Sequence, residues 1–135
     1  MAASVLVDAG FLVALLNKRD GNHAWATAQA AQHPPPWKTC EAALSEAFHL
    51  LEANGTPALS ELMRRNALQC AFSLADHFEA VLALMHKYRD VPMSLADACF
   101  VRMTEMAGRI VLLTTDADFR VYRRHSRQVI PCAFP

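Results

Sequence analysis

The chain has 135 residues, of which 53% are hydrophobic and 19% are charged. This length fits a single domain over residues 1–135 with a full hydrophobic core, and the composition excludes an intrinsically disordered chain. Thirteen basic residues balance 13 acidic ones, so the molecule as a whole has no electrostatic attraction for nucleic acid, and any such binding must come from a local patch.

The cysteines and the apolar runs bear on the cellular compartment. The cysteines are Cys40, Cys70, Cys99 and Cys132. They form no C-x-x-C pair and have mostly apolar neighbours, which favours reduced, buried side chains over a zinc site or a disulfide framework. The N-terminus lacks the features of a signal peptide, and no apolar stretch approaches the roughly 18 to 20 residues that span a membrane. We therefore expect a cytoplasmic protein that does not enter a membrane.

The first half of the chain predicts alternating strands and helices. Its first apolar run, 5–7, is typical of a strand buried on both faces, and later apolar residues recur at helical spacing. The predicted elements are a strand at 5–7, a helix at 11–17, a helix capped by the Asn22 side chain and ending near Gln32, a weak strand at 37–40, a helix from Ala42 to a stop at Asn54-Gly55, and a helix at 57–67.

The second half continues this alternation. The predicted elements are a strand at 68–73, a helix at 74–88, a helix at 95–107 capped by Ser94, a strand at 109–115, a short helix at 119–124 and a strand at 128–134. Pro131 cannot donate to a ladder, so the last strand belongs at a sheet edge. Together these elements predict an α/β fold, a three-layer α/β/α sandwich with a central parallel sheet of four to five strands.

Four carboxylates stand where an apolar strand ends or an amphipathic helix begins: Asp8, Glu46, Asp97 and Asp116. Because parallel strands bind ligands outside their carboxyl ends, we expect Asp8 and Asp116 at one edge of one sheet. Carboxylates gathered in a partly buried cleft resist ionisation unless a cation lies among them, and oxygen ligands favour Mg²⁺ or Mn²⁺ over zinc. The pattern therefore predicts a metal-dependent phosphodiesterase.

Each of these acids also has a simpler explanation. Asp8 can cap the helix that follows it, and Asp116 or Asp118 can start the next one. We interpret Glu46 and Asp97 as lying inside helices, away from the capping positions. Glu46 lies close to an apolar stripe, where a solvated glutamate is not expected, and the alternative for Asp97 is a buried salt bridge to an arginine.

Four further residues are secondary candidates for the same site. The hydroxyl of Thr115, like that of its neighbour Thr114, can hold a metal-bound water or a phosphate oxygen. Asp118 can serve a second metal or act indirectly, and Asp90 can close the mouth of the cleft. Glu41 lies about 140° from Glu46 on an ideal helix, so it would join the pocket from the preceding loop.

Other motifs in the sequence give less support for a functional site. The six histidines show no metalloprotease spacing, and the chain contains no P-loop, dinucleotide fingerprint or G-x-S-x-G string. Arginines cluster after Asp116 and can contact phosphates beside the acidic centre, although a solvated helix face is the more frequent explanation: Arg120, Arg123, Arg124 and Arg127.

Four strings, in order, carry a resemblance over essentially the whole chain. They are VLVDAGFLVALL at 5–16, TCEAALSEA at 39–47, YRDVPMSLADA at 88–98 and LTTDADF at 113–119. With these strings the chain resembles the PIN-domain family, in particular VapC-like toxin ribonucleases and their close relatives. Thr115 matches a hydroxyl residue that the family often has beside its last acid, whereas Gly10 departs from the serine or threonine common near the first.

The resemblance implies more than the fold. It makes Asp8, Glu46, Asp97 and Asp116 an acidic quartet that binds Mg²⁺ or Mn²⁺ and cleaves RNA to leave a 5′-phosphate and a 3′-hydroxyl. It also implies a homodimer and an antitoxin protein that blocks the site. We expect Asp8, Asp97 and Asp116 to hold one or two cations, with Glu46 a ligand directly or through water, so that metal-bound water attacks the phosphodiester.

Two alternatives stay open. A PIN fold can bind RNA or a partner protein without turnover, as the neutral charge and the absence of a strongly basic surface allow. A phosphoryl-transfer domain of receiver or Toprim type also clusters acids at strand ends. The receiver type lacks its expected lysine here, and the Toprim type rests on Asp116-Ala-Asp118 alone.

Overall fold

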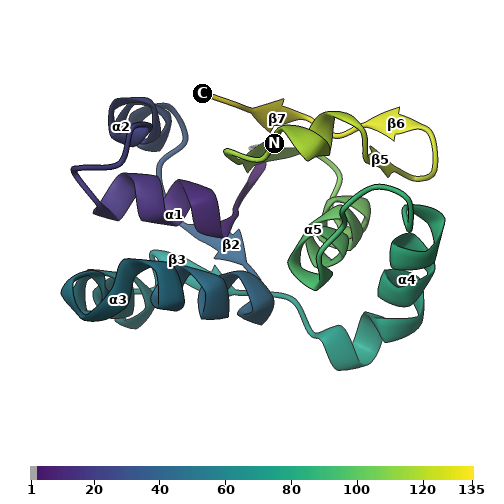
Figure 1. Ribbon diagram of the computed structural model, residues 1–135, viewed down its shortest axis with the longest axis horizontal. Coiled ribbons are helices and arrows are strands. Elements are labelled where there is room, and N and C mark those ends of the chain that lie inside the picture. Colours follow the sequence, from purple (N-terminus) through teal and green to yellow (C-terminus); the bar gives the residue numbers. More distant parts are fainter. Residues whose placement is uncertain (1–2) are drawn as a thin grey trace.

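A parallel β-sheet forms the centre of the computed structural model, which describes residues 3–135 (Figure 1). Within this range the sheet has five strands in the order β3-β2-β1-β4-β7, and every neighbouring pair is parallel. The strands are β1 (Ser4–Val7), β2 (Trp37–Thr39), β3 (Leu68–Cys70), β4 (Ile110–Leu113) and β7 (Cys132–Ala133). The predicted parallel sheet of four to five strands is thus confirmed.

Helices cover both faces of this sheet, as Figure 1 shows. They are α1 (Ala9–Leu16), α2 (His23–Gln32), α3 (Glu41–Arg64), α4 (Leu74–Lys87) and α5 (Leu95–Met106). Successive side chains of a strand point to opposite faces. Val7 accordingly packs into the core with α1, α2 and α3, while Leu6 packs into the core with α4 and α5. The predicted three-layer α/β/α arrangement is therefore confirmed.

The strand order reverses between β1 and β4. These strands lie side by side at the centre of the sheet, with Val7 paired with Leu113, and the chain leaves β1 at Asp8 and β4 at Thr114. In open parallel sheets a crevice forms at such a switch point, outside the carboxyl ends of the strands. The two segments that carry Asp8 and Asp116 therefore meet at the place where ligands bind in this class of fold.

The C-terminal segment differs from the prediction. A 3₁₀ helix at Ala117–Arg120 and strand β5 (Arg123–Arg124) replace the predicted helix at 119–124, and β5 pairs in antiparallel fashion with β6 (Gln128–Val129). The predicted strand at 128–134 is two strands, β6 and β7, because Pro131 has no amide hydrogen and Ile130 turns into the core between them. β7 does lie at the sheet edge, as predicted.

Helix α3 contains a break that was predicted at a different residue. The non-helical residue is Glu52, with φ 56° and ψ −160°, rather than Asn54-Gly55. Gly55 does not end the helix. Its lack of a side chain is needed for packing, since a Cβ there would lie 2.6 Å from the Cβ of Leu51, too close for two carbon atoms. The two helices predicted on either side of the stop are therefore continuous in sequence and separated by one strained residue.

Three smaller predictions also fail. The strand predicted at 68–73 ends at Cys70, and Cys70 is exposed rather than buried, although all four cysteines are free. Asn22 occupies the N-cap of α2, but its side chain makes no capping hydrogen bond. Instead its backbone N–H donates to Oδ1 of Asp20 at 2.8 Å, which satisfies the turn before the helix.

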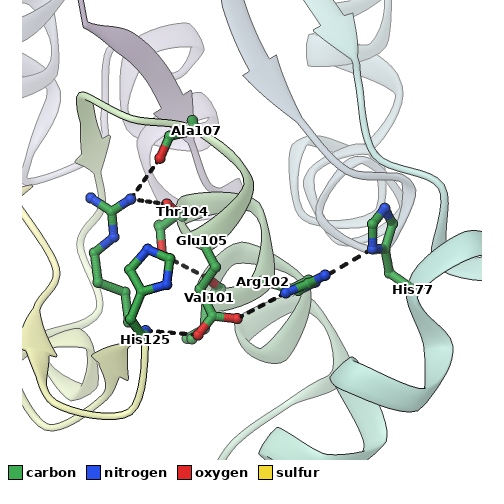
Figure 2. A network of polar contacts seen from close by, with 8 residues as sticks. His77, Val101, Arg102, Thr104, Glu105, Ala107 and His125 are labelled. Carbon is green, nitrogen blue, oxygen red and sulfur yellow. Dashed lines mark hydrogen bonds and ion pairs between the residues drawn. The ribbon is translucent and has the colours of Figure 1, made fainter.

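A polar network holds α4 and the β5–β6 hairpin against α5 (Figure 2). Arg102 on α5 contacts Nδ1 of His77 on α4 at 3.4 Å and a carboxylate oxygen of Glu105 at 3.5 Å. The other Glu105 oxygen accepts the backbone N–H of His125 at 2.8 Å, where the chain takes a left-handed conformation with φ 50°. This network positions α5, which carries Asp97 at its opposite end.

No helix within residues 3–135 is long and apolar enough to cross a membrane. The expected cytoplasmic location stays a prediction.

Candidate active site

A cavity of about 400 Å³ lies at the switch point of the sheet, and all four predicted carboxylates line it. The acids come from four separate segments of the chain, with Asp8 after β1, Glu46 on α3, Asp97 on α5 and Asp116 after β4. Apolar residues and small residues complete the walls: Ala9, Gly10, Ala43, Leu50, Ala96 and Phe100, with Ser94 and Thr115. The structure thus brings the four acids to one hollow.

Asp8 is the most buried of the four acids and has both carboxylate oxygens engaged. Its Oδ1 accepts the backbone N–H of Phe11 at 2.9 Å and so caps α1, while its Oδ2 accepts the hydroxyl of Thr114. Burial, with smaller contributions from the charges of Asp116 and Asp97, outweighs the opposing effect of the hydrogen bonds and raises the pKa of Asp8 from 3.8 to about 6. Capping and the predicted metal role are therefore compatible at this residue.

Asp97 lies at the third position of α5 and not, as predicted, away from the capping positions. Its Oδ2 accepts the backbone N–H of Ser94, and the Ser94 hydroxyl accepts the backbone N–H of Asp97, each at 3.0 Å. The hydroxyl of Tyr122 lies 3.4 Å from the same Oδ2. Burial raises the pKa of Asp97 with an added contribution from the charge of Asp116. No arginine pairs with Asp97 in the described part of the chain, so the salt-bridge alternative is wrong.

Asp116 begins the 3₁₀ helix, where its Oδ1 accepts the backbone N–H of Asp118 at 2.9 Å. Its own N–H donates to the Thr114 hydroxyl at 2.9 Å, so Thr114 connects Asp116 to Asp8. Glu46 differs from the prediction in being exposed, and within residues 3–135 its carboxylate makes no hydrogen bond or ion pair. It faces the cavity as the most accessible of the four acids.

The secondary candidates separate into two groups. Thr115 lines the cavity, and its hydroxyl occupies the space above Gly10, since a Cβ on Gly10 would overlap with Thr115 Oγ1. The missing side chain at position 10 therefore makes room for a hydroxyl from the other strand end. Three acids lie outside the residues that line this cavity: Glu41, Asp90 and Asp118. Glu41 instead borders a separate cavity of about 300 Å³ beside Cys40 and Cys99.

The arginines after Asp116 are bound to the protein itself. Arg124 is buried, and its guanidinium donates to the carbonyls of Thr104, Ala107 and Gly108 at the C-terminus of α5. Arg123 donates to backbone carbonyls of its own segment, and Arg120 lies 4.4 Å over the ring of Phe134. Arg124 is therefore not available for a phosphate contact, whereas Arg120 and Arg127 are exposed, and none of the four arginines lines the acidic cavity.

The donor set fits a hard divalent cation. Asp97 Oδ1 and Asp116 Oδ2 make no hydrogen bond within the described chain, both Glu46 oxygens are likewise available, and the engaged oxygens of Asp8 and Asp116 each accept a single hydrogen bond. No lysine or arginine is among the described residues that line the cavity. As placed, no three His, Cys, Asp or Glu side chains of residues 3–135 are close enough to hold one ion. Mutual repulsion keeps uncompensated carboxylates apart.

Sequence reasoning missed two residues that position the acids. Thr114 was considered as a holder of water or phosphate, whereas the structure uses its hydroxyl to join Asp8 to Asp116. Tyr122 is fully buried, donates to the Pro92 carbonyl at 2.8 Å and contacts Asp97, and no sequence pattern indicates this. The role of Asp97 at the helix start did carry a signal, because Ser94-Leu-Ala-Asp97 before an apolar run matches a capping box.

Comparison with known proteins bears on the fold and the family of the chain. The family model of the PIN domain matches residues 5–124. The crystal structure of Mycobacterium tuberculosis VapC20, described as a toxin that cleaves the sarcin-ricin loop, superposes with a TM-score of 0.75 over 87% of this chain and 94% of that chain at 24% identity. No curated protein matches the sequence. The match over residues 5–124 spans most of the sequence, and the chain therefore belongs to the PIN-domain family.

Proposed function

We propose that the protein is an endoribonuclease that depends on Mg²⁺ or Mn²⁺ and acts as the toxin of a toxin–antitoxin pair. The observation that carries this proposal is the cavity in which four carboxylates from separate segments meet without a basic side chain among its described lining residues. Membership of the PIN-domain family and the similarity of fold to a toxin that cleaves the sarcin-ricin loop support the same conclusion.

Each acid would have a defined part in this reaction. Asp8, Asp97 and Asp116 would hold one or two cations, with Glu46 as the most accessible ligand, directly or through water. A divalent cation in such a site lowers the pKa of a bound water and neutralises charge on the phosphate. Thr114 fixes the separation of Asp8 and Asp116, and Tyr122 and Ser94 orient Asp97. Thr115 presents a hydroxyl toward the substrate side of the cavity.

Partners follow from the same resemblance. We propose an RNA substrate, a homodimer and an antitoxin that covers the acidic cavity, with the protein acting in the cytoplasm. The similarity in fold to VapC20 supports the RNA substrate, because that protein is described as a toxin that cleaves the sarcin-ricin loop.

A binding module without turnover is the second candidate function. One observation favours it. In the described chain no three of the carboxylates that line the cavity lie close enough together to hold one metal ion. Such a protein would sequester RNA or a partner and would show no dependence on divalent cations.

Metal-dependent cleavage separates the two candidates. The parent protein is incubated with total RNA and Mg²⁺, with and without EDTA, and product ends are mapped. We expect 5′-phosphate products with Mg²⁺ and none with EDTA. Asp97→Asn keeps the hydrogen bond to Ser94 and should lower the rate at least about 100-fold.

Asp76→Asn is the matched control, because Asp76 is an exposed acid in the first turn of α4. It should cleave at the parental rate. A parent protein that leaves RNA intact with Mg²⁺ and with Mn²⁺ would refute the nuclease, and equal rates for Asp97→Asn and parent would refute the assigned acids.

A further inference from the structure

A second cavity lies at the other end of the seam between α1 and α3. It has a volume of about 350 Å³ and is lined by Leu16, Asn17, Arg19, Leu50 and residues 51–55 around the break in α3, except residue 53. Leu50 also lines the acidic cavity, so the two hollows share a wall. The acidic cavity begins at the N-terminus of α1, and the second one is reached after its eight residues, about 12 Å at 1.5 Å per residue.

The acidic cavity needs a source of positive charge for a polyanionic substrate. A metal neutralises the phosphate at the reacting bond, whereas the neighbouring phosphates of an RNA strand need separate cations. The chain as a whole is neutral, so this charge must be local.

A survey of the basic side chains leaves few that can fill this role. Several already contact the protein: Lys87, Arg89, Arg102, Arg109, Arg120, Arg123 and Arg124. The side chains of Lys18, Arg19, Lys38, Arg64, Arg65 and Arg127 have no such contact within the described chain. Of these, Arg19 lines a cavity that borders the acidic one, whereas Lys38 lines cavities with Ser4, at the start of β1.

The cavity offers polar groups besides Arg19. Asn17 Oδ1 accepts the backbone N–H of Arg19 at 3.1 Å, which holds the Arg19 backbone and leaves the Asn17 amide N–H groups available. Asn54 adds a second exposed amide to the lining of the cavity. Glu52 also lines the cavity, at the break in α3, so its exposed carboxylate opposes phosphate binding and Arg19 must outweigh it.

We propose that the cavity around Arg19 binds a further phosphate of the same RNA strand, outside the acidic cavity, with Leu50 between the two sites. This inference rests on the proposed ribonuclease function, because it adds a second contact for the same substrate. Arg19 contributes a charge-assisted hydrogen bond to a phosphate oxygen, which positions the strand without reading its sequence.

The test uses RNA binding and RNA cleavage as separate measurements. Binding of a fluorescently labelled single-stranded RNA is followed by anisotropy in EDTA, where turnover is absent, over a series of salt concentrations. Arg19→Gln should weaken binding about tenfold and lower the slope of log K against log salt by about 0.7. Arg19→Lys should recover most of the slope. Arg64→Gln is the matched control, an exposed and unengaged arginine at the far end of α3, and should match the parent.

The cleavage measurement uses Mg²⁺ and compares a long RNA with a dinucleotide that is too short to reach Arg19. On the long RNA, Arg19→Gln should raise KM about tenfold with kcat unchanged, and on the dinucleotide it should match the parent. Thermal melting confirms that the variants are folded.

The outcomes distinguish the two levels of the proposal. If Arg19→Gln and Arg64→Gln behave alike in binding and slope, or if the parent binds no RNA at low salt, the Arg19 site is overturned. If binding depends on Arg19 while Mg²⁺ supports no cleavage, the Arg19 site stands and the nuclease function falls.

Discussion

Two groups of like charge differ in what surrounds them. Three of the four carboxylates of the cavity have helix N–H groups or hydroxyls as partners, Glu46 has none in the described chain, and no basic side chain is among the described lining residues. Three of the arginines that follow Asp116 contact carbonyl oxygens or an aromatic ring, namely Arg120, Arg123 and Arg124, and Arg124 is the most buried of them. Both groups looked functional in the sequence, yet the charge of Arg124 is compensated by the protein whereas that of the acids is not.

This difference concerns free energy as well as geometry. A buried guanidinium that donates hydrogen bonds to several carbonyl oxygens stabilises the fold, because its removal leaves those carbonyls without partners. Buried carboxylates that repel one another destabilise the fold until an outside cation neutralises them. The two groups should therefore respond to substitution with opposite signs.

The largest expected change in stability is the loss of Arg124. Arg124→Ala should lower the free energy of unfolding by about 3 kcal/mol, because the carbonyls of Thr104, Ala107 and Gly108 at the end of α5 lose their donor. Urea unfolding measures this change. Arg127→Ala, which removes an exposed arginine from the same segment, should stay within about 0.5 kcal/mol of the parent. Equal effects of the two substitutions would remove the contrast between the groups.

Asp8 should show the opposite sign, with a defined pH dependence. Its pKa is raised from 3.8 to about 6, so the folded state binds a proton more tightly than the unfolded state. Stability from this group is therefore present at low pH and is lost as the pH rises between these two values. In EDTA at pH 8, Asp8→Asn should be more stable than the parent by about 2 kcal/mol.

The difference between Asp8→Asn and the parent should vanish near pH 3.5, below the unfolded value of 3.8. Urea unfolding at both pH values provides the measurement, and added Mg²⁺ should stabilise the parent more than the variant at pH 8. A less stable Asp8→Asn at pH 8 in EDTA would contradict the view that the acids carry uncompensated charge.

The smallest expected effect tests the packing around the acids. Gly10→Ala should destabilise the protein by about 1 kcal/mol, because the new methyl group displaces the Thr115 hydroxyl. In a Thr115→Ala background the cost should fall to nearly zero, because the hydroxyl is gone and alanine favours the helix, while the Cβ of residue 115 stays 3.3 Å from the new methyl group. A double-mutant cycle by chemical denaturation in EDTA measures this loss of the penalty. Additive effects would show that the two positions do not share this space.

Much of the fold was predictable because its signals are local. The apolar runs of β1 and β4 mark buried strands, and the alternation with helices predicts a parallel sheet. The C-terminal segment was not predictable in the same way. Its strands β5, β6 and β7 have two residues each, too few for a periodic pattern, and their pairing depends on contacts distant in sequence.

The candidate site shows the same division. The positions of Asp8 and Asp116 follow from strand ends, which a sequence displays. The exposure of Glu46 cannot be read from the sequence in the same way, because it depends on how α3 packs against the rest of the fold. Tyr122 could not be found either, since a buried tyrosine hydroxyl contacts Pro92 and Asp97 through the folding of three separate segments.

Three of the four acids also begin helices, with Asp8 and Asp116 at N-caps and Asp97 in a capping box. Asparagine can keep these hydrogen bonds while removing the charge, whereas alanine removes both. A survey of every substitution at these positions should therefore yield two distinct phenotypes. On the proposed function, asparagine variants would accumulate in the cell as folded protein without nuclease activity, and alanine variants would be depleted by proteolysis before a loss of activity could be observed.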